Sequence, residues 1–406
     1  MIFNKNILVF LYLYLVTFCF LFGLRFNLIV VNIVVYVPLI IYGVLYVLGI
    51  RKSRKYNYYW NCFLLMVLVY FIVVMMIVNS SISLPFQAIF NIALTLGFYN
   101  VCCKVYKSDV IYKISKMFFV ATLIQSFCVY LTKIFPYLNE LPFIMLQKLG
   151  NMNVDQVISV NVRVFGFSNG GGDGLGFSLS MGLCFSLYFS ILMLNKHRSY
   201  LKQTIMLSSV LFIISSNLFV SRTSLVASIL LLVLFVVMLL WGKKYKEIMS
   251  LLVICVLAVN LIVLSHVNLW WALESYYSYV NTGDIDRGSL NVLLNKMIFL
   301  PSDTFTLLFG LSPVSGTDIG YVRYLFNTGI VFSFILYVSI VFTYIRCMLV
   351  SSSIEIKYLL FILLFCTLLF QAKVAFITVG LALKIIVLVV LLFNRHDLKN
   401  CSGVHI

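Results

Sequence analysis

Four arginines occur in short polar motifs between long apolar segments. Arg163 lies in "NVRVFGFSNGGGDGLGF", Arg222 in "SRTS", Arg287 in "GDIDRGS" and Arg323 in "DIGYVRYL". A guanidinium presents a planar fork of donors that matches phosphate oxygens in pairs, and it stays charged when partly desolvated. If the four converge, they could bind a phosphorylated ligand. The alternative is that each snorkels or pairs locally, as Arg287 could with Asp284 or Asp286.

One histidine and several carboxylates could accept a proton. Asp318 precedes Arg323 by five residues, so we expect the pair to flank a loop-to-helix transition, with Arg323 in the first helical turn. His266 ends an apolar segment and could act as a general base, although a lone histidine there more often packs. The candidates for a general base are His266, Asp173, Asp284, Asp286 and Asp318. The sequence does not select one of them.

A glycine-rich stretch, "GGGDGLGF" (170–177), resembles a phosphate-binding loop in composition. It lacks the Lys-Ser/Thr pair of a P-loop, and no strand precedes it. We therefore predict a flexible entry to the helix that follows. The alternative is that bare amides at the start of that helix help to hold an anion.

The elements that must position these residues are membrane helices. The 406 residues are 63% hydrophobic and only 10% charged, and the mean hydropathy is +1.09. This composition excludes an ordinary soluble domain and predicts a lipid-embedded bundle. The net charge of +17 does not indicate nucleic-acid binding, because the basic residues lie between apolar runs, where they determine topology.

The chain is expected to be a single all-α polytopic membrane domain over residues 1–406, with about twelve spans. Each span must satisfy its own backbone hydrogen bonds in lipid, so each is predicted to be a helix. No small-residue cleavage site follows the first apolar segment, which is therefore counted as a span. The predicted spans are 7–24, 28–50, 59–78, 84–103, 117–135, 174–194, 204–220, 224–241, 248–266, 324–346, 357–372 and 374–393.

Orientation is predicted from the distribution of Lys and Arg between alternate ends of the spans. One side has 19 of these residues and the other has 9, so the richer side is expected to be cytoplasmic, with both termini inside. The tail 394–406 is then cytoplasmic, and two long loops, about 136–173 and 267–323, face outward. All four motif arginines are also on the outer side, three of them in these loops and Arg222 in a short turn. No metal-ligand spacing occurs in these loops, so neither a metal nor a cofactor is expected.

Lys384 falls within the last predicted span, where a charge is costly and often marks a polar cavity. Lys373 lies eleven residues earlier, which is three helical turns, so a continuous helix would place the two lysines on one face. A structural pairing is the alternative.

Three of these stretches resemble those of the O-antigen and capsular polysaccharide polymerases (the Wzy family). They are "RVFGFSNGGGDGLGFSLSMG", "SRTSLVASILLLVLF" and "GTDIGYVRYLFNTGIVFSFILYV". Members of that family have an Arg before a Gly/Phe-rich helix start, an "SRT/SRS" turn, and an acidic-Gly-Tyr-hydrophobic-Arg motif before a late span. The resemblance covers the order and spacing of motifs from about 160 to 346.

The resemblance implies a C-type, all-helical glycosyltransferase of the bacterial cytoplasmic membrane. Such an enzyme transfers a growing glycan from its polyprenyl diphosphate carrier to the non-reducing end of a lipid-linked repeat unit. By motif, Arg163, Arg222 and Arg323 would bind the diphosphate or stabilise the leaving group, and Asp318 would order that site. A role for Arg287 is less well matched, because it lies among acidic residues. Implied partners are polyprenyl-diphosphate-linked oligosaccharides, membrane lipid and a chain-length regulator protein, but no nucleic acid.

Two other functions fit parts of the pattern. An O-antigen ligase shares the architecture and the donor, and its catalytic histidine lies within the large outer loop, whereas His266 lies at the start of that loop. A lipid-linked oligosaccharide flippase is a transporter that also has about twelve spans. It would be expected to place charges along a central cavity and to have short outer loops, and this sequence shows the opposite on both points.

Overall fold

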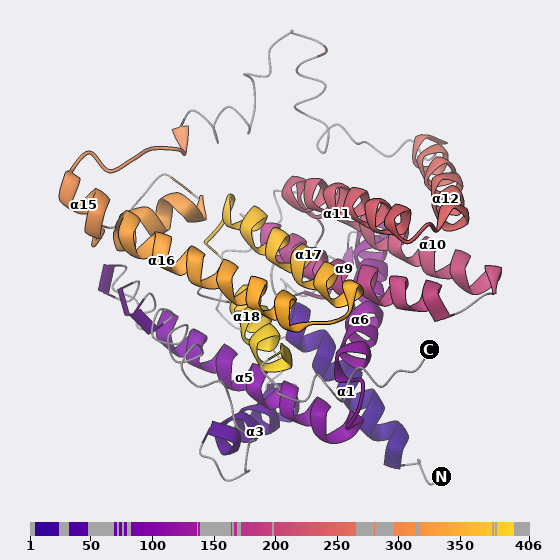
Figure 1. Cartoon of the computed structure of the whole chain (residues 1–406), viewed down its shortest axis with the longest axis horizontal. Coiled ribbons are helices and arrows are strands. Elements are labelled where there is room, and N and C mark those ends of the chain that lie inside the picture. Colours follow the sequence, from indigo (N-terminus) through magenta and orange to yellow (C-terminus); the bar gives the residue numbers. More distant parts are fainter. Residues whose placement is uncertain are drawn as a thin grey trace. The chain divides into compact units, whose positions relative to one another are not determined.

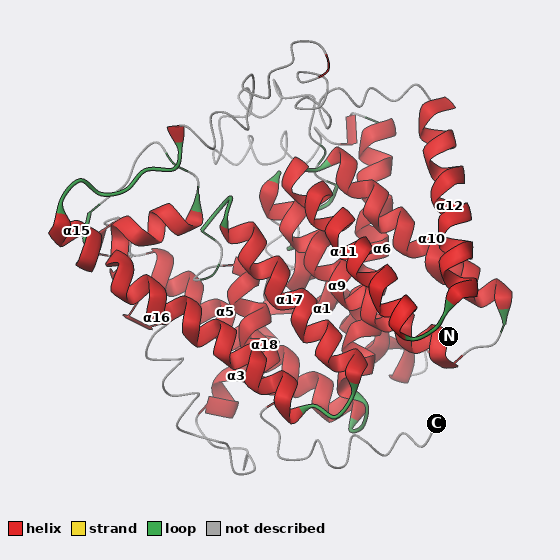
Figure 2. Ribbon diagram, turned by 45° about the horizontal axis from the view of Figure 1, so that its top comes forward, coloured by secondary structure: helices red, strands yellow, loops and turns green. Residues whose placement is uncertain are grey.

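The structure is a computed structural model, and the part described here is helical (Figures 1 and 2). The described residues are 5–23, 32–47, 69–70, 73–74, 77–78, 83–135, 137–138, 164, 166–168, 172–196, 199–264, 280, 296–312, 317, 319–375, 377 and 380–393. The chain divides into two compact units, each discontinuous in sequence. Unit 1 is Met1–Val35, Ile111–Ala272 and Ile406, and unit 2 is Tyr36–Val110 and Leu273–His405. The single domain expected over 1–406 stays a prediction.

Seven helices of the described part are long and apolar enough to cross a membrane. They are Phe86–Tyr106, Val110–Ile134, Asp173–Lys196, Tyr200–Phe219, Arg222–Trp241, Gly320–Val350 and Ile354–Gln371. Shorter apolar helices occupy Ile7–Phe22, Val34–Leu45 and Gly380–Phe393. The expectation of a multi-pass helical membrane protein is confirmed to this extent. The count of twelve stays a prediction, and most of the predicted span 59–78 lies outside the described residues.

Unit 1 is built around a buried central helix, α9. Every residue of this helix from Leu175 to Ile191 is buried. Its glycines and serines let neighbouring helices approach closely, which is the usual basis of helix packing where lipid supplies no hydrophobic driving force. The helical elements of unit 1 are α1 (Lys5–Phe22), α6 (Val110–Ile134), α9 (Asp173–Lys196), α10 (Tyr200–Ser216), η2 (Asn217–Phe219), α11 (Arg222–Trp241) and α12 (Tyr245–Leu264).

Helices α6 and α9 of unit 1 run antiparallel. The hydroxyl of Tyr112, near the start of α6, donates to Sδ of Met193, near the end of α9 (3.7 Å). Further along, a side chain at Gly182 of α9 would collide with Thr122 of α6. This register places the end of α6 beside the start of α9, which is the end of the unit that carries two of the sequence motifs.

Unit 2 contains a tight helix pair and a broken helix. A Cβ atom at Gly43 or at Gly97 would overlap backbone of the facing helix, so α3 and α5 pack backbone to backbone. Helix α18 also packs against α5, and α16 lies beside α17 (Figure 1). A π-helical turn, η1 (Asn32–Tyr36), precedes α3 in the chain, and all of it except Tyr36 belongs to unit 1. The helices of unit 2 are α3 (Val37–Val47), α5 (Ser83–Tyr106), α15 (Thr304–Phe309), α16 (Gly320–Val350), α17 (Ile354–Gln371) and α18 (Gly380–Phe393).

Helix α16 is interrupted at Gly329, which has φ 71° and ψ 172°. The carbonyls of Asn327 and Phe326 accept hydrogen bonds from the backbone N–H groups of Leu311 (2.9 Å) and Ser312 (3.1 Å). The segment after α15 thus satisfies groups that the break leaves without helical donors, as a membrane protein requires. Gly310 packs directly on Gly329, because a Cβ at either position would collide with backbone of the other segment.

The expected common face for Lys373 and Lys384 is wrong. Helix α17 ends at Gln371 and α18 begins only at Gly380, so Lys373 lies in the connection, where its N–H donates to the carbonyl of Phe370. Gly380 has φ +68°, a left-handed conformation through which a right-handed helix does not extend toward its N-terminus. The last apolar helix is therefore shorter than the predicted span 374–393.

Candidate phosphate-binding site

The structure describes two of the four motif arginines, one in each unit. Arg222 is the first residue of α11 in unit 1, and Arg323 lies in the first turn of α16 in unit 2. Both side chains are half-buried. Arg163, Arg287, Asp318 and His266 lie outside the described residues, and the convergence of the four arginines stays a prediction.

The "SRTS" motif is the start of α11. Ser221 is the N-cap residue, and its Oγ accepts a hydrogen bond from the N–H of Ser224 (3.1 Å). Ser224 in turn donates from its Oγ to the Ser221 carbonyl (2.8 Å). The first of these bonds satisfies a backbone N–H that a helix start would otherwise leave unpaired. The tight turn expected around Arg222 is confirmed, and its two serines fix the backbone that carries the arginine.

The glycine-rich stretch begins α9 and brings that helix against the start of α11. Helix α9 starts at Asp173, directly after Gly172, which has φ +53°. A Cβ at Gly176 would lie 2.7 Å from Ser221 Oγ and 2.7 Å from Ser224 Cβ, so only glycine permits this approach. The expectation of a helix entry is confirmed. Two helix N-termini, each with partial positive charge, therefore lie side by side.

The segment that follows Arg163 is held against the turn between α10 and α11. The N–H of Val164 donates to the carbonyl of Phe219 (3.0 Å), and Ser168 Oγ donates to the Phe22 carbonyl at the end of α1 (2.9 Å). Gly166 (φ +55°) packs on the buried side chain of Gln125. Two of the three motifs are thus joined in unit 1, although Val164 and Phe219 are 55 residues apart in sequence.

Side-chain hydroxyl groups and one amide hold the turn between α10 and α11 in place. Ser216 Oγ donates to Ser126 Oγ (3.1 Å), and the hydroxyl of Tyr130 donates to Ser215 Oγ (2.6 Å). Asn217 is fully buried and its Nδ2 donates to Ser228 Oγ of α11 (2.9 Å). Sequence reasoning missed these residues, because single polar residues in an apolar run give no sign of which helix they face.

Lys133, at the end of α6, also reaches this turn. Its Nζ lies 5.8 Å from the ring centroid of Phe219, and its side chain is exposed. In the sequence analysis Lys133 entered only as one of the nine basic residues of the outer side. Its position there, on the side with few lysines and just before a long loop, was the signal that could have identified it as a candidate.

In unit 2, Arg323 is fixed by the loop that precedes α16. Its Nε donates to the carbonyl of Thr317 (2.8 Å), and its backbone N–H donates to the Ile319 carbonyl (3.0 Å). Thr317 is buried. Its Oγ1 accepts from the Ile319 N–H (3.1 Å) and donates to the carbonyl of Met297 (2.9 Å). The prediction that Arg323 lies in the first helical turn is confirmed.

The Gly-Tyr pair of the third motif anchors the same helix start to α17. Gly320 lies against Gln371, where a Cβ would approach the amide of that residue to 2.6 Å. The hydroxyl of Tyr321 donates to the carbonyl of Leu368 (2.7 Å). Gln371 Nε2 donates to the hydroxyl of Tyr337, whose ring packs on that of Tyr321 (centroids 5.0 Å apart). The motif therefore sets the orientation of the turn that bears Arg323.

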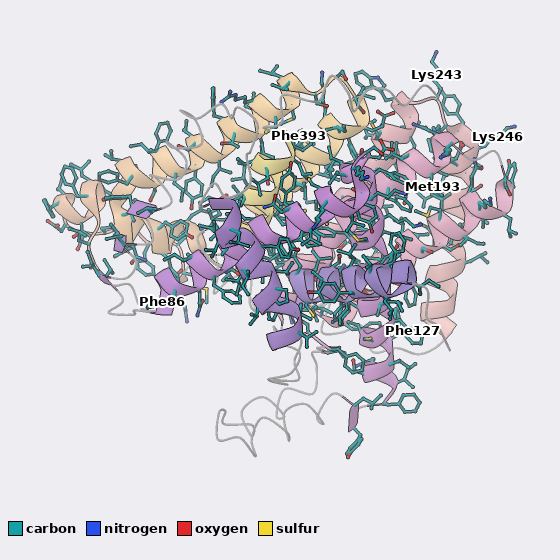
Figure 3. The ribbon with its side chains drawn as sticks, turned by 90° about the horizontal axis from the view of Figure 1, so that it is seen from below. Phe86, Phe127, Met193, Lys243, Lys246 and Phe393 are labelled. Atoms are coloured by element: carbon teal, nitrogen blue, oxygen red, sulfur yellow. The ribbon has the colours of Figure 1, made fainter. Side chains whose placement is uncertain are left out.

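The opposite end of unit 1 is rich in lysine. Met193, Lys243 and Lys246 lie toward one end of this unit and Phe127 of α6 toward the other (Figure 3). Lysines at the ends of helices on that side include Lys113, Lys116, Lys196, Lys202, Lys243, Lys244 and Lys246. Among the described residues of unit 1, the motif-bearing end has Lys133 and Arg222. The charge imbalance inferred from the sequence thus corresponds to two ends of a folded unit.

No group of three or more His, Cys, Asp or Glu residues within the described ranges could hold a metal ion. Comparison of the chain with protein-family models, with characterised proteins and with solved structures finds no match.

Proposed function

We propose that this chain is a membrane-embedded polysaccharide polymerase. It would transfer a growing glycan from a polyprenyl diphosphate carrier to the non-reducing end of a lipid-linked repeat unit. The observation that carries the proposal is the junction in unit 1, where the segment after Arg163, the capped "SRTS" turn and the start of α9 meet. The resemblance assigns these same motifs to the diphosphate site.

The chemistry of this junction fits a lipid diphosphate. Arg222 is presented at a helix start that is itself partly positive, next to the start of a second helix. When the glycosidic carbon is attacked by the acceptor hydroxyl, its bond to the diphosphate breaks and negative charge develops on the leaving oxygens. Cationic donors that are already oriented stabilise this charge without further reorganisation. In this proposal Arg163, Arg222 and Arg323 supply these donors, as the resemblance implies.

The proposed location is the outer face of a bacterial cytoplasmic membrane. The lysine-rich end of unit 1 would be cytoplasmic by the positive-inside rule, and the motif-bearing end would face outward. In this orientation the diphosphate headgroup lies at the membrane surface where the motifs are, and its polyprenyl chain stays in the bilayer. The acceptor proton would pass to an outer-loop carboxylate or to His266.

Surface polysaccharide from a host that lacks the gene tests this function. A polymerase defect leaves single repeat units on the surface, whereas a flippase or ligase defect leaves none. Arg222→Ala and Arg323→Ala should each give the single-unit pattern while the protein still reaches the membrane. Lys202→Ala, a change of an exposed lysine at the opposite end of unit 1, should leave full-length chains. Full-length chains in both arginine variants would overturn the proposed site.

A further inference from the structure

We infer that Lys133 is a further ligand-binding residue, which contacts the diphosphate of the lipid carrier together with Arg222. This inference rests on the proposed function. It adds a cation that the motifs do not contain, because Lys133 lies about 30 residues before Arg163 and outside every motif-bearing segment.

The position of Lys133 carries the inference. Its Nζ lies over the ring of Phe219 (5.8 Å), and the carbonyl of that same Phe219 accepts the N–H of Val164. Phe219 precedes Arg222 by three residues, so their Cα atoms are at most about 11 Å apart. A lysine and an arginine side chain can span such a distance to a single headgroup. One aromatic residue therefore links the lysine, the first motif and the second motif.

The ring beneath the ammonium group is itself fixed. Phe219 packs edge-on against Tyr130 (centroids 5.4 Å apart), and Tyr130 stacks on Phe212 (4.8 Å). The hydroxyl of Tyr130 is held by its bond to Ser215. A cation placed over a rigid ring loses less conformational freedom when it binds a ligand than a freely rotating lysine would.

A purely structural role explains this lysine less well. A cation–π contact at an exposed site contributes little to stability, and the positive-inside rule disfavours a lysine at this end of the helix. Its charge is more useful to a ligand than to the fold. A compact ammonium group also complements the arginine fork, because it adds charge to a second phosphate without requiring bidentate geometry. The ligand class is therefore a prenyl diphosphate in preference to a monophosphate.

Binding to the purified full-length chain tests this role. The protein is placed in nanodiscs of neutral lipid and titrated with farnesyl diphosphate, farnesyl monophosphate, farnesol and inorganic pyrophosphate. We expect the wild-type chain to prefer farnesyl diphosphate. Lys133→Gln should weaken that binding about 5- to 30-fold, the loss of one charge-assisted contact, and should reduce the preference over the monophosphate. Lys133→Arg should bind within about threefold of wild type, since it keeps the charge.

Three controls separate the possible outcomes. Lys202→Gln, on an exposed lysine of the opposite end, should bind as wild type does. Phe219→Leu, which keeps an apolar side chain but removes the ring, should weaken binding less than Lys133→Gln. Nanodiscs with phosphatidylglycerol should not abolish the effect of Lys133→Gln; if they do, the lysine binds bulk phospholipid and the inference is overturned.

Failure of the inference differs from failure of the proposed function. If Arg222→Gln weakens farnesyl diphosphate binding and Lys133→Gln does not, Lys133 has no part in the site and the function stands. If the wild-type chain binds farnesyl diphosphate no better than farnesol, the diphosphate site itself is wrong.

Discussion

The two described arginines both lie in the first turn of a helix but are positioned by different means. At Arg222 the backbone is fixed locally, because Ser221 and Ser224 of the same motif cap the helix. At Arg323 the helix start has no side-chain cap, and Ile319 stands at the N-cap position. There the side chain is fixed by Thr317, which is tied to a residue 20 positions earlier in the chain. A short motif is thus enough to fix the helix start that carries Arg222, whereas the helix start that carries Arg323 depends on long-range contacts of the loop before it.

The largest expected effect of substitution is in unit 2, where a glycine faces backbone. Gly329→Ala places a Cβ against the backbone of Leu308 and requires a left-handed φ from alanine. The two costs together should destabilise the protein by about 3 kcal/mol or more. In Gly176→Ala of unit 1 the atoms nearest to the added Cβ belong to the side chains of Ser221 and Ser224, and the change should cost about 1–2 kcal/mol.

Thermal unfolding in detergent checks this order. Gly174→Ala is the matched control, because nothing lies within 4 Å of the added Cβ, and it should not destabilise. A Gly329→Ala protein as stable as Gly174→Ala would show that the break in α16 is not held by this contact.

The second effect concerns the long-range support of Arg323. Thr317→Val keeps the shape of the residue and removes the Oγ1 that bonds Ile319 and Met297. We expect polymer yield to fall roughly tenfold, equivalent to about 1.4 kcal/mol in the transition state, as Arg323 loses its orientation. Thr317→Ser should restore it. The amount of polymer on gels, normalised to protein in the membrane, is the measurement. Equal loss in Thr317→Ser would indicate a packing defect instead.

The third effect concerns the local cap at Arg222. Ser221→Ala should cost about 1 kcal/mol of stability and shorten the polysaccharide. Ser353→Ala is matched to it, since Ser353 caps α17 with the same kind of bond to Ile356, away from the motifs. Ser353→Ala should lower the melting temperature similarly and leave the length of the polysaccharide unchanged. If both variants shorten the polysaccharide equally, the Ser221 cap acts only through the general stability of the protein.

The smallest effect is a pH response at α15, the short helix before the break in α16. Asp303 caps this helix by accepting from the N–H of Thr306 (2.8 Å), and this bond lowers the pKa of its carboxyl group. Because the pKa of Asp303 is lower in the folded state, the ionised carboxylate stabilises the folded helix start. This stabilisation is complete at pH values above the unfolded pKa of about 3.9, and it is lost as the pH falls through the folded pKa. Exchange of the Thr306 amide, corrected for intrinsic rate, should therefore accelerate in acid. Asp303→Asn retains a cap and should remove the dependence on pH.

Local features of the site could be predicted from the sequence. Arg323 in a first helical turn, the tight turn at Arg222 and the helix entry at 170–177 follow from residue types within a few positions of each other. Hydropathy also indicates the helical membrane class. These signals are short-range or compositional, so a single chain contains them.

Features that depend on contacts between distant segments could not be predicted. Asn327, Thr328 and Gly329 interrupt an otherwise apolar run for only three residues, so averaged hydropathy predicts one continuous helix there. The placement of Lys133 over Phe219 requires the register of α6 against α10, which no motif specifies. The error at Lys373 has the same origin, because an apolar connection looks like part of a span when only composition is considered.

The break at Gly329 divides α16 into a short part before it and a long part after it, and the two parts suit different regions of a bilayer. Residues 330–350 extend about 31 Å at 1.5 Å per residue, close to the hydrocarbon thickness of a bilayer. The helical turns before the break are then not needed to cross the hydrocarbon core of the bilayer and can lie among the lipid headgroups. Arg323 would keep its charge there at small solvation cost, at the depth where the phosphates of a lipid carrier reside.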